Sequence, residues 1–488
     1  MKTKMRIPSL LLALITSISM LAGCGSSAPT ASNTPSPTAT TQATPSPDAS
    51  QPTQNPDTIT ALLPPVSPNY QANFEQMEKD FNTLYPHLTL KIEPASWEDM
   101  TQKLDVQVNA GTPPDIAFIG SSGISKYVET GLLMDISQSA TAEMIADFAE
   151  GPLAYMQSGG GLYGFPAYMS IQSIGGNKEF MEAAGIDWKS VQQNGWTFEE
   201  FREAIKKGVV TEGNNISRYG FVFACSGVTS KDYLSLMVKQ AGMPAAFRTD
   251  LKYAYTSKNF LEVLKSIRLL IDDGSMPKEI SSVDAGKRWN MFLTGQTMIT
   301  GKGLSVFENS AKTNNAKIDA NDGSAVKDSI KVEYIVLPLP TFFGNSEQNF
   351  AAVDGYVTFR GKDEPTAEHT GNVVAAAYYL SSGKVAAQTN GDLLLADITN
   401  SAREAAKGLN LERSAENQAA SERLVANAAP ARPDIPTDLG AKAIKIEDEV
   451  IVPKFQALLA NEISPQEMYD AVKAAAIEAF GEDGIVVD

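Results

Sequence analysis

The sequence predicts an α/β protein built around a largely parallel sheet. Short apolar runs of strand length alternate with longer segments whose apolar residues recur at helical spacing. The run Thr58–Leu63 precedes a helical pattern over 69–85, and the strand-like run Leu88–Ile92 precedes another over 97–108. A third apolar run follows at Ile116–Ile119. Strand, helix, strand, helix, strand is the typical order of a parallel α/β sheet.

The third strand has the clearest boundaries of these elements. Gly111 is a good stop for the preceding helix, and Pro113 and Pro114 prevent that helix from continuing. A small polar loop containing Ser121 and Ser122 follows the strand. Ligands of open α/β sheets bind beyond the carboxyl ends of strands, so we expect both serines to line a small-molecule cleft.

The N-terminus has the form of an export signal. Lys2, Lys4 and Arg6 precede a short apolar stretch over residues 7–22, which is too short for a comfortable membrane span. Small residues then precede Cys24, in a pattern that resembles the lipobox of bacterial lipoproteins. That resemblance implies a signal peptide over 1–23 and a mature N-terminus at Cys24 that carries diacylglycerol and palmitate-type chains. The alternative is an ordinary signal that happens to contain a cysteine.

Residues 24–57 read as a tether. They are dominated by Ser, Thr, Pro, Ala and Gln, and Thr34–Pro37 is repeated at Thr44–Pro47. With so little apolar bulk, this segment has no means of forming a core. At the polyproline rise of ~3.1 Å per residue it reaches on the order of 100 Å.

Size, charge and cysteine content limit the classes of protein to which this chain can belong. The remaining chain of more than 400 residues is long enough for two domains. The formal net charge is −17, and −20 once the three cations of the signal are removed, which argues against nucleic acid as a partner. Cys225 is then the only cysteine, so no internal disulfide is expected and a buried apolar role is favoured. With only His87 and His369 as histidines, we expect no metal and no cofactor.

Sequence signatures of catalysis are weak. Gly159–Gly164 matches G-x-G-x-x-G but precedes a strand-like segment, so a glycine-rich turn is favoured. Neither a phosphate-binding P-loop nor a G-x-S-x-G elbow occurs, and Asp319–Gly323 departs from a calcium loop at its glycine and its last ligand. A glycosidase needs two facing carboxylates, which a sequence rich in acids leaves possible. An exported glycoside-acting enzyme is therefore one alternative.

A set of short motifs resembles the extracellular solute-binding protein family 1. Its members are sugar-type substrate-binding components of ABC importers, and the resemblance is to the maltodextrin-binding group. The matching segments, in order between residues 58 and 480, include Asn109–Asp115, Gly131–Ile136, Gly161–Pro166, Asn177–Phe180, Ala183–Ile186, Gly195–Phe201, Phe292–Ile299 and Leu337–Pro340.

The resemblance implies a type II periplasmic-binding-protein-like fold, with a ligand cleft between two α/β lobes. Lobe 1 is expected over 58–167 plus about 353–405, and lobe 2 over 168–352 plus about 406–488. The crossovers are placed near 167–171 and 353–356. The polar stretch 310–329 is expected to be a surface loop.

Candidate ligand-binding residues lie at strand ends and crossovers. They are Ser67, Trp97, Ser121, Ser122, Tyr168, Ser170, Trp289, Lys302, Phe307, Asp354 and Tyr356. Aromatic rings can stack on sugars while polar groups fix their orientation. Core packing is an equal alternative for Trp97 and Trp289. Lys302 lies where members of the resembled family often place an aromatic side chain against the sugar. Phe307 is expected to supply the aromatic ring instead. Asp115 reads mainly as a structural acid.

We therefore expect a monomeric lipoprotein anchored to the cell membrane on its extracytoplasmic side. It would capture a small solute, a sugar or oligosaccharide, and deliver it to ABC permease subunits. A ligand sensor that presents its closed form to a membrane receptor is a second alternative.

Overall fold

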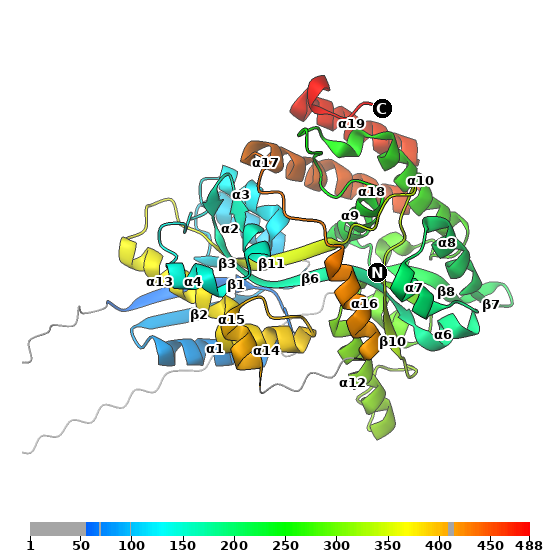
Figure 1. Ribbon diagram of the computed structural model, residues 1–488, viewed down its shortest axis with the longest axis horizontal. Coiled ribbons are helices and arrows are strands. Elements are labelled where there is room, and N and C mark those ends of the chain that lie inside the picture. The colour runs from blue at the N-terminus through cyan, green and yellow to red at the C-terminus, as the bar shows by residue number, and fades with distance from the viewer. Residues whose placement is uncertain (1–54, 68–69, 98, 408–413) are drawn as a thin grey trace, which may run out of the picture. The chain divides into compact units, whose positions relative to one another are not determined.

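A nine-stranded mixed sheet runs through the chain, with β6 at its centre (Figure 1). The computed structural model describes residues 55–67, 70–97, 99–407 and 414–488, so the predicted lipidation at Cys24 lies outside the described residues. The strand order is β2-β1-β3-β11-β6-β9-β8-β7, and β10 also pairs with β6. The strands are β1 (Asp57–Leu63), β2 (Leu88–Pro94), β3 (Ile116–Gly120), β4 (Gln157–Ser158), β5 (Gly161–Leu162), β6 (Gly164–Asn177), β7 (Val210–Glu212), β8 (Asn215–Phe223), β9 (Thr297–Gly303), β10 (Tyr334–Leu337) and β11 (Phe350–Thr358).

Helices pack along the sheet, and the predicted α/β class is confirmed (Figure 1). The helices are α1 (Tyr70–Leu84), α2 (Met100–Ala110), α3 (Ile124–Glu129), α4 (Ala142–Asp147), α5 (Glu150–Ala154), α6 (Lys178–Ala183), α7 (Trp188–Asn194), α8 (Phe198–Lys207), α9 (Ser230–Gln240), α10 (Lys258–Asp272), α11 (Ala285–Leu293), α12 (Val306–Ala320), α13 (Ala367–Ser381), α14 (Gly383–Leu393), α15 (Asn400–Ala406), α16 (Ala415–Ala426), α17 (Thr437–Ile446), α18 (Val452–Leu459) and α19 (Pro465–Phe480).

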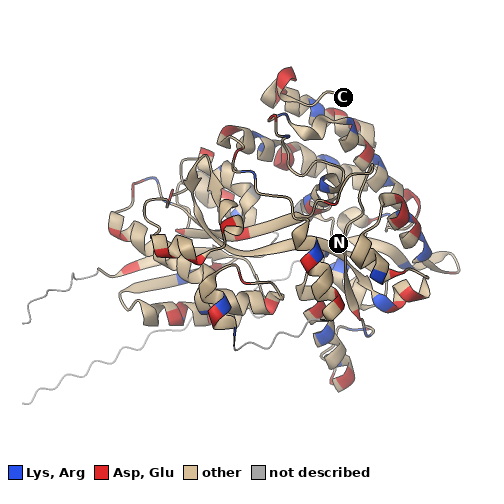
Figure 2. Cartoon of the chain, viewed as in Figure 1, with Lys and Arg blue, Asp and Glu red and all other residues tan. Residues whose placement is uncertain are grey.

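Two hydrophobic cores lie along the sheet, one toward each end. The first core is drawn from Ile59–Tyr168 and Val353–Ile398, and the second mainly from Ile174–Phe342 and Ala443–Ile485. Cys225 is fully buried in the second core, as its apolar neighbours predict. Acidic and basic positions are mixed along the helices around both cores (Figure 2).

Strands β6 and β11 connect the two cores. Residues 164–172 of β6 pair with β11, which in turn pairs with β3 of the first core. From Ser173 to Asn177, β6 instead pairs with β9 and β10, whose side chains belong to the second core and a small neighbouring cluster. One continuous strand therefore changes partners between Gln172 and Ser173, and both predicted crossovers fall within β6 and β11.

The prediction of a surface loop over 310–329 is wrong for its first half, where α12 is a regular helix. Glu308, Ala311 and Asn314 are buried at intervals of three residues, and two of them are polar. The buried face of α12 therefore carries no apolar stripe from which a helix could be predicted. Asn314 accepts a hydrogen bond from the Val326 amide at 2.9 Å, which ties the following segment back to the helix.

Candidate functional site

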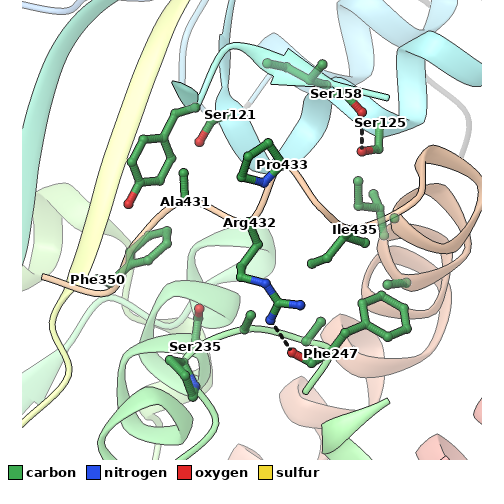
Figure 3. Close-up of a pocket in the computed structure, with 18 of the residues that line it drawn as sticks. Ser121, Ser125, Ser158, Ser235, Phe247, Phe350, Ala431, Arg432, Pro433 and Ile435 are labelled. Atoms are coloured by element: carbon green, nitrogen blue, oxygen red, sulfur yellow. Dashed lines mark hydrogen bonds between the residues drawn. The ribbon is translucent and has the colours of Figure 1, made fainter. Parts of the chain in front are cut away.

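A cavity of about 280 Å³ opens between elements of the two cores (Figure 3). Ser121, Ser125 and Ser158 reach it from the first core, and Ser235 reaches it from α9. Aromatic rings also line it, namely Tyr155, Phe247, Tyr253, Tyr255 and Phe350. Hydroxyl groups and rings are the chemistry that a polar ligand with apolar ring faces requires.

A segment from the C-terminal part of the chain closes one side of the cavity. We call residues 429–448 the bridging segment, because it contacts both cores. Its Ala443 and Ile446 pack in the second core, while the Ala429 carbonyl accepts a hydrogen bond from Tyr155 at 2.7 Å. Arg432 lies inside the cavity wall and donates to the Phe247 carbonyl at 2.9 Å (Figure 3).

The position of Ser121 follows from the local sequence. The buried strand β3 ends at Gly120, and residues 121–123 form a short 3₁₀ turn that leads into α3. Ser125 lies one turn further on and shares a hydrogen bond of 3.3 Å with Ser158 (Figure 3). The strand end that we predicted to face a ligand therefore does border the cavity, at Ser121.

Charged side chains line the cavity, and all but one are neutralised by an ion pair. Lys231 pairs with Glu447 at 2.9 Å, and Asp232 pairs with Lys302 at 3.1 Å. Arg432 pairs with Asp434 at 2.7 Å. Lys239 has no ion pair among the described residues.

Lys239 is 7% exposed and donates to the Pro244 carbonyl at 2.6 Å, with its ammonium 4.8 Å from the centre of the Phe350 ring. Burial lowers the pKa of Lys239 to about 8, because a charged amine is costly away from water, although Glu447 acts to raise it.

A buried polar pair lies at the crossing of β6 and β11. The Tyr168 hydroxyl donates to Asp354 at 2.8 Å. Burial raises the pKa of Asp354, while the bond from Tyr168 and the charge of Lys302 act to lower it. Lys302 itself pairs with Asp232, which lines the cavity, whereas Tyr168 and Asp354 are not part of the lining.

The other predicted ligand residues lie outside the cavity lining. Ser67, Ser170 and Tyr356 are buried, and Trp97 is 44% exposed with its ring edge-on to Phe118 at 5.9 Å. Trp289 stacks on Phe307 at 4.5 Å between ring centres. The side chain of Ser122 lies outside the described residues. Ser121 is thus the one predicted ligand residue that the described cavity lining includes, and the others stay predictions.

The sequence analysis did not predict several residues that line the cavity, and only some of these residues carry a signal in the sequence. Ser125 stands four residues, or one helical turn, after Ser121, so a search at that spacing from the predicted residue could have found it. Ser235 stands at the same spacing from Lys231, which is not among the predicted residues. Arg432 and Lys239 carry no such signal. Arg432 lies far along the chain from its neighbours, and Lys239 resembles any solvent-facing lysine of a helix.

A second cavity, of about 420 Å³, is lined by residues of α1, α13, α14 and adjoining turns, and by Ser401 of α15. Its rings are Tyr85, Tyr378 and Tyr379, and its charges are Asp80 and Lys384. It draws on the first core alone and lies away from the carboxyl ends of the parallel strands. The cavity between the cores is therefore the better candidate for a ligand site.

The family model for bacterial extracellular solute-binding proteins matches residues 64–377, which is more than half of the chain. The chain therefore belongs to that family, and the resemblance seen in its motifs is confirmed. Proteins of this family bind a solute outside the cytoplasm.

Curated binding proteins match part of the chain in sequence. Named binding proteins of Brucella abortus and Brucella suis are 27% identical over 234 residues, which is 48% of this chain and 55% of theirs. The chain thus matches about half the length of these curated relatives.

Solved structures match over most of the chain. An ABC substrate-binding protein of Listeria monocytogenes in complex with cycloalternan has a TM-score of 0.67 at 16% identity, covering 88% of this chain and all of that one. Maltose-bound MalE3 of T. maritima has a TM-score of 0.66 at 18% identity, and the match covers 87% of this chain and 99% of that one. A solute-binding protein of Thermotoga lettingae bound to α-D-tagatose has a TM-score of 0.65 at 19% identity, and the match covers 87% of this chain and 98% of that one. The predicted type II periplasmic-binding-protein-like fold is confirmed.

Proposed function

We propose that this protein is the substrate-binding component of an ABC importer and that its solute is a saccharide. The observation that carries the proposal is the cavity between the two cores, where serine hydroxyls face aromatic rings. Sugars offer hydroxyl groups at their edges and apolar faces above and below the ring, and both find partners there. Three solved structures of the same fold hold cycloalternan, maltose and tagatose, which supports the same ligand class.

Capture would take place between two lobes that correspond to the two cores. The division at 58–167 with about 353–405, and 168–352 with about 406–488, is supported by the separate composition of these cores. β6 and β11 would act as the hinge, and the closed form would be presented to the membrane permease subunits. The protein would act as a monomer and without catalysis.

A thermal-shift and calorimetric screen of the purified protein tests the proposal. The panel holds maltose, mannobiose, longer neutral oligosaccharides and acidic disaccharides, with dipeptides and free amino acids as the contrasting set. A bound saccharide should raise the melting temperature in a concentration-dependent way by mass action. Stabilisation by dipeptides or amino acids alone, with no saccharide active, would contradict the proposal.

Residues 1–57 would attach this body to the membrane. In our proposal Cys24 carries the lipid, residues 1–23 are removed, and the Ser/Thr/Pro-rich segment spans the gap to the folded part. Among the described residues, no helix is both long and apolar enough to cross a bilayer. Mass spectrometry of the membrane-extracted protein should find acyl chains on an N-terminal Cys24, and a Cys24→Ala variant should be released from membranes.

A further inference from the structure

We propose that the saccharide bound between the cores carries a carboxylate, and that the Lys239 ammonium is its counter-ion. This inference rests on the proposed saccharide-binding function and makes its ligand class more specific. It starts from the balance of charges around the cavity. Lys231, Asp232 and Arg432 all have an ion-pair partner, whereas Lys239 has none among the described residues.

Burying an unpaired ammonium is costly, so the surroundings of Lys239 need an explanation. An ammonium has three N–H donors, and the described residues supply one carbonyl acceptor, that of Pro244 at 2.6 Å. The Phe350 ring adds a weaker attraction at 4.8 Å. Two donors on a cavity wall are therefore left for a ligand.

The number of free charges selects the kind of anion. A carboxylate carries one negative charge and can accept both remaining N–H donors, which matches one unpaired cation. A phosphate carries up to two charges near neutral pH and would need a second free cation. Lys231 is already paired with Glu447, which also lines the cavity, so Lys231 is not free to neutralise a second negative charge on the ligand. A singly charged anion is therefore better accommodated than a doubly charged one.

The neighbouring side chains fit the rest of such a molecule. Ser235 lies one turn before Lys239 on α9, and Ser121, Ser125 and Ser158 face it from the other core (Figure 3). These groups can exchange hydrogen bonds with sugar hydroxyls. The cavity of about 280 Å³ lies just below the range of about 300–1,000 Å³ that is typical of small-molecule sites, which favours a small uronate-bearing saccharide such as a disaccharide.

The test compares acidic saccharides with their own methyl esters by calorimetry at pH 7. The probes are a galacturonyl-rhamnose and a glucuronyl-xylose disaccharide, which carry one carboxylate each, and each is paired with the methyl ester that keeps the ring and linkage but not the charge. The wild-type protein should bind at least one acid roughly 10- to 100-fold more tightly than its ester, the range expected for a charge-assisted hydrogen bond. Lys239→Gln should remove that preference, so that the acid and its ester bind with similar affinity.

Three further variants control for folding and for general charge. Lys239→Met keeps the apolar stem and should give the same loss as Lys239→Gln if the glutamine variant folds poorly. Lys239→Arg should retain part of the preference. Lys252→Gln removes an exposed lysine that does not line the cavity, and it should bind as the wild type does.

Several results would overturn the inference. Equal binding of acid and ester, tighter binding of galactose 6-phosphate than of any uronate, or unchanged acid binding by the Lys239 variants would each do so. If neutral oligosaccharides bind and no acid does, the inference fails while the proposed function stands. If no saccharide of either kind binds, the proposed function and this inference fail together.

Discussion

Two of the places where the cores meet among the described residues differ in kind. At the hinge, β6 and β11 carry the backbone from one core to the other inside a hydrogen-bonded sheet. At the bridging segment, the cores touch through side chains that can separate. Ser158 meets Thr437 at 3.4 Å, and Lys126 meets Asp448 at 3.4 Å. The paired strands therefore join the cores through the backbone, whereas in our proposal of hinge closure the bridging contacts form and break with that motion.

The largest expected effect comes from disturbing the hinge. Gly355 stands at the bulge between β11 and β6, and a Cβ there would lie 2.5 Å from the Phe165 carbonyl oxygen. Gly355→Val should lower the free energy of unfolding by about 1–3 kcal/mol, or more if the strands separate. Urea unfolding measures this. Gly361→Val, where the nearest atom is 4.0 Å away, is the matched control, and a loss there of equal size would contradict the account.

The next effect comes from pushing the bridging segment off the first core. A Cβ on Gly440 of α17 would lie 2.7 Å from the Ser125 hydroxyl oxygen of α3. Gly440→Leu should widen the distance between spin labels at Glu129→Cys and Glu462→Cys, because α17 has to move away from α3. Ligand affinity should fall on the order of tenfold, or about 1.4 kcal/mol.

The control for that experiment is Gly371→Leu in α13, where a Cβ would meet nothing within 4 Å. It should leave the label distance and the affinity as in the wild type. If Gly440→Leu also leaves the distance unchanged while the protein stays folded, the bridging segment is not a separable contact.

A smaller effect is expected from the ion pair in the bridging contact. Lys126 and Asp448 are about a third exposed, so solvent screens their attraction. Asp448→Asn should cost less than about 1 kcal/mol of closing free energy, and the loss should shrink at high salt. Label distances recorded at low and high salt measure it. A larger, salt-independent change would show that the bridging segment is held more rigidly than its contacts indicate.

The smallest effect on the arrangement of the cores should come from His369, a half-buried side chain of α13 whose polar partners belong to the elements of the first core. Its ring nitrogens face Asp57 at 2.7 Å and Asp115 at 3.2 Å. Burial acts to lower the pKa of His369, but these two carboxylates outweigh it and leave the pKa raised.

The folded protein therefore holds this proton more tightly than the unfolded chain does. The stabilisation is complete below about pH 6.5, the ordinary histidine value, and is lost as the pH rises through the folded-state pKa. Unfolding free energy should fall over that range in the wild type and less in His369→Gln, with label distances unchanged in both. A pH-dependent distance would contradict the confinement of this cluster to one core.

Local signals in the sequence were reliable where they have a local cause. Thr197 and Glu200 have the spacing of a capping box and form one at the start of α8, and β3 starts and stops at its predicted boundaries within one residue. Asp115 makes the structural contacts expected of it, accepting from Thr60 at 2.8 Å. These features depend on residues within a few positions or on a simple apolar run.

Features that depend on distant partners could not be predicted in the same way. α12 buries polar Asn314 and Glu308, so its pattern hides its helix. The cavity brings Ser121, Lys239 and Arg432 together from three separate parts of the chain. Their meeting is set by strand pairing across the hinge and by the path of the bridging segment, neither of which leaves a periodic trace in the sequence.

Titration of a saccharide into two cavity-filling variants is the most direct test that the crevice between the cores is the ligand site. Ser235→Trp fills that cavity from α9, and Lys384→Trp places the same ring in the cavity that belongs to the first core alone. We predict that a saccharide bound by the wild type is lost in Ser235→Trp and retained in Lys384→Trp, with both proteins folded by circular dichroism. Retained binding in Ser235→Trp together with loss in Lys384→Trp would contradict the account.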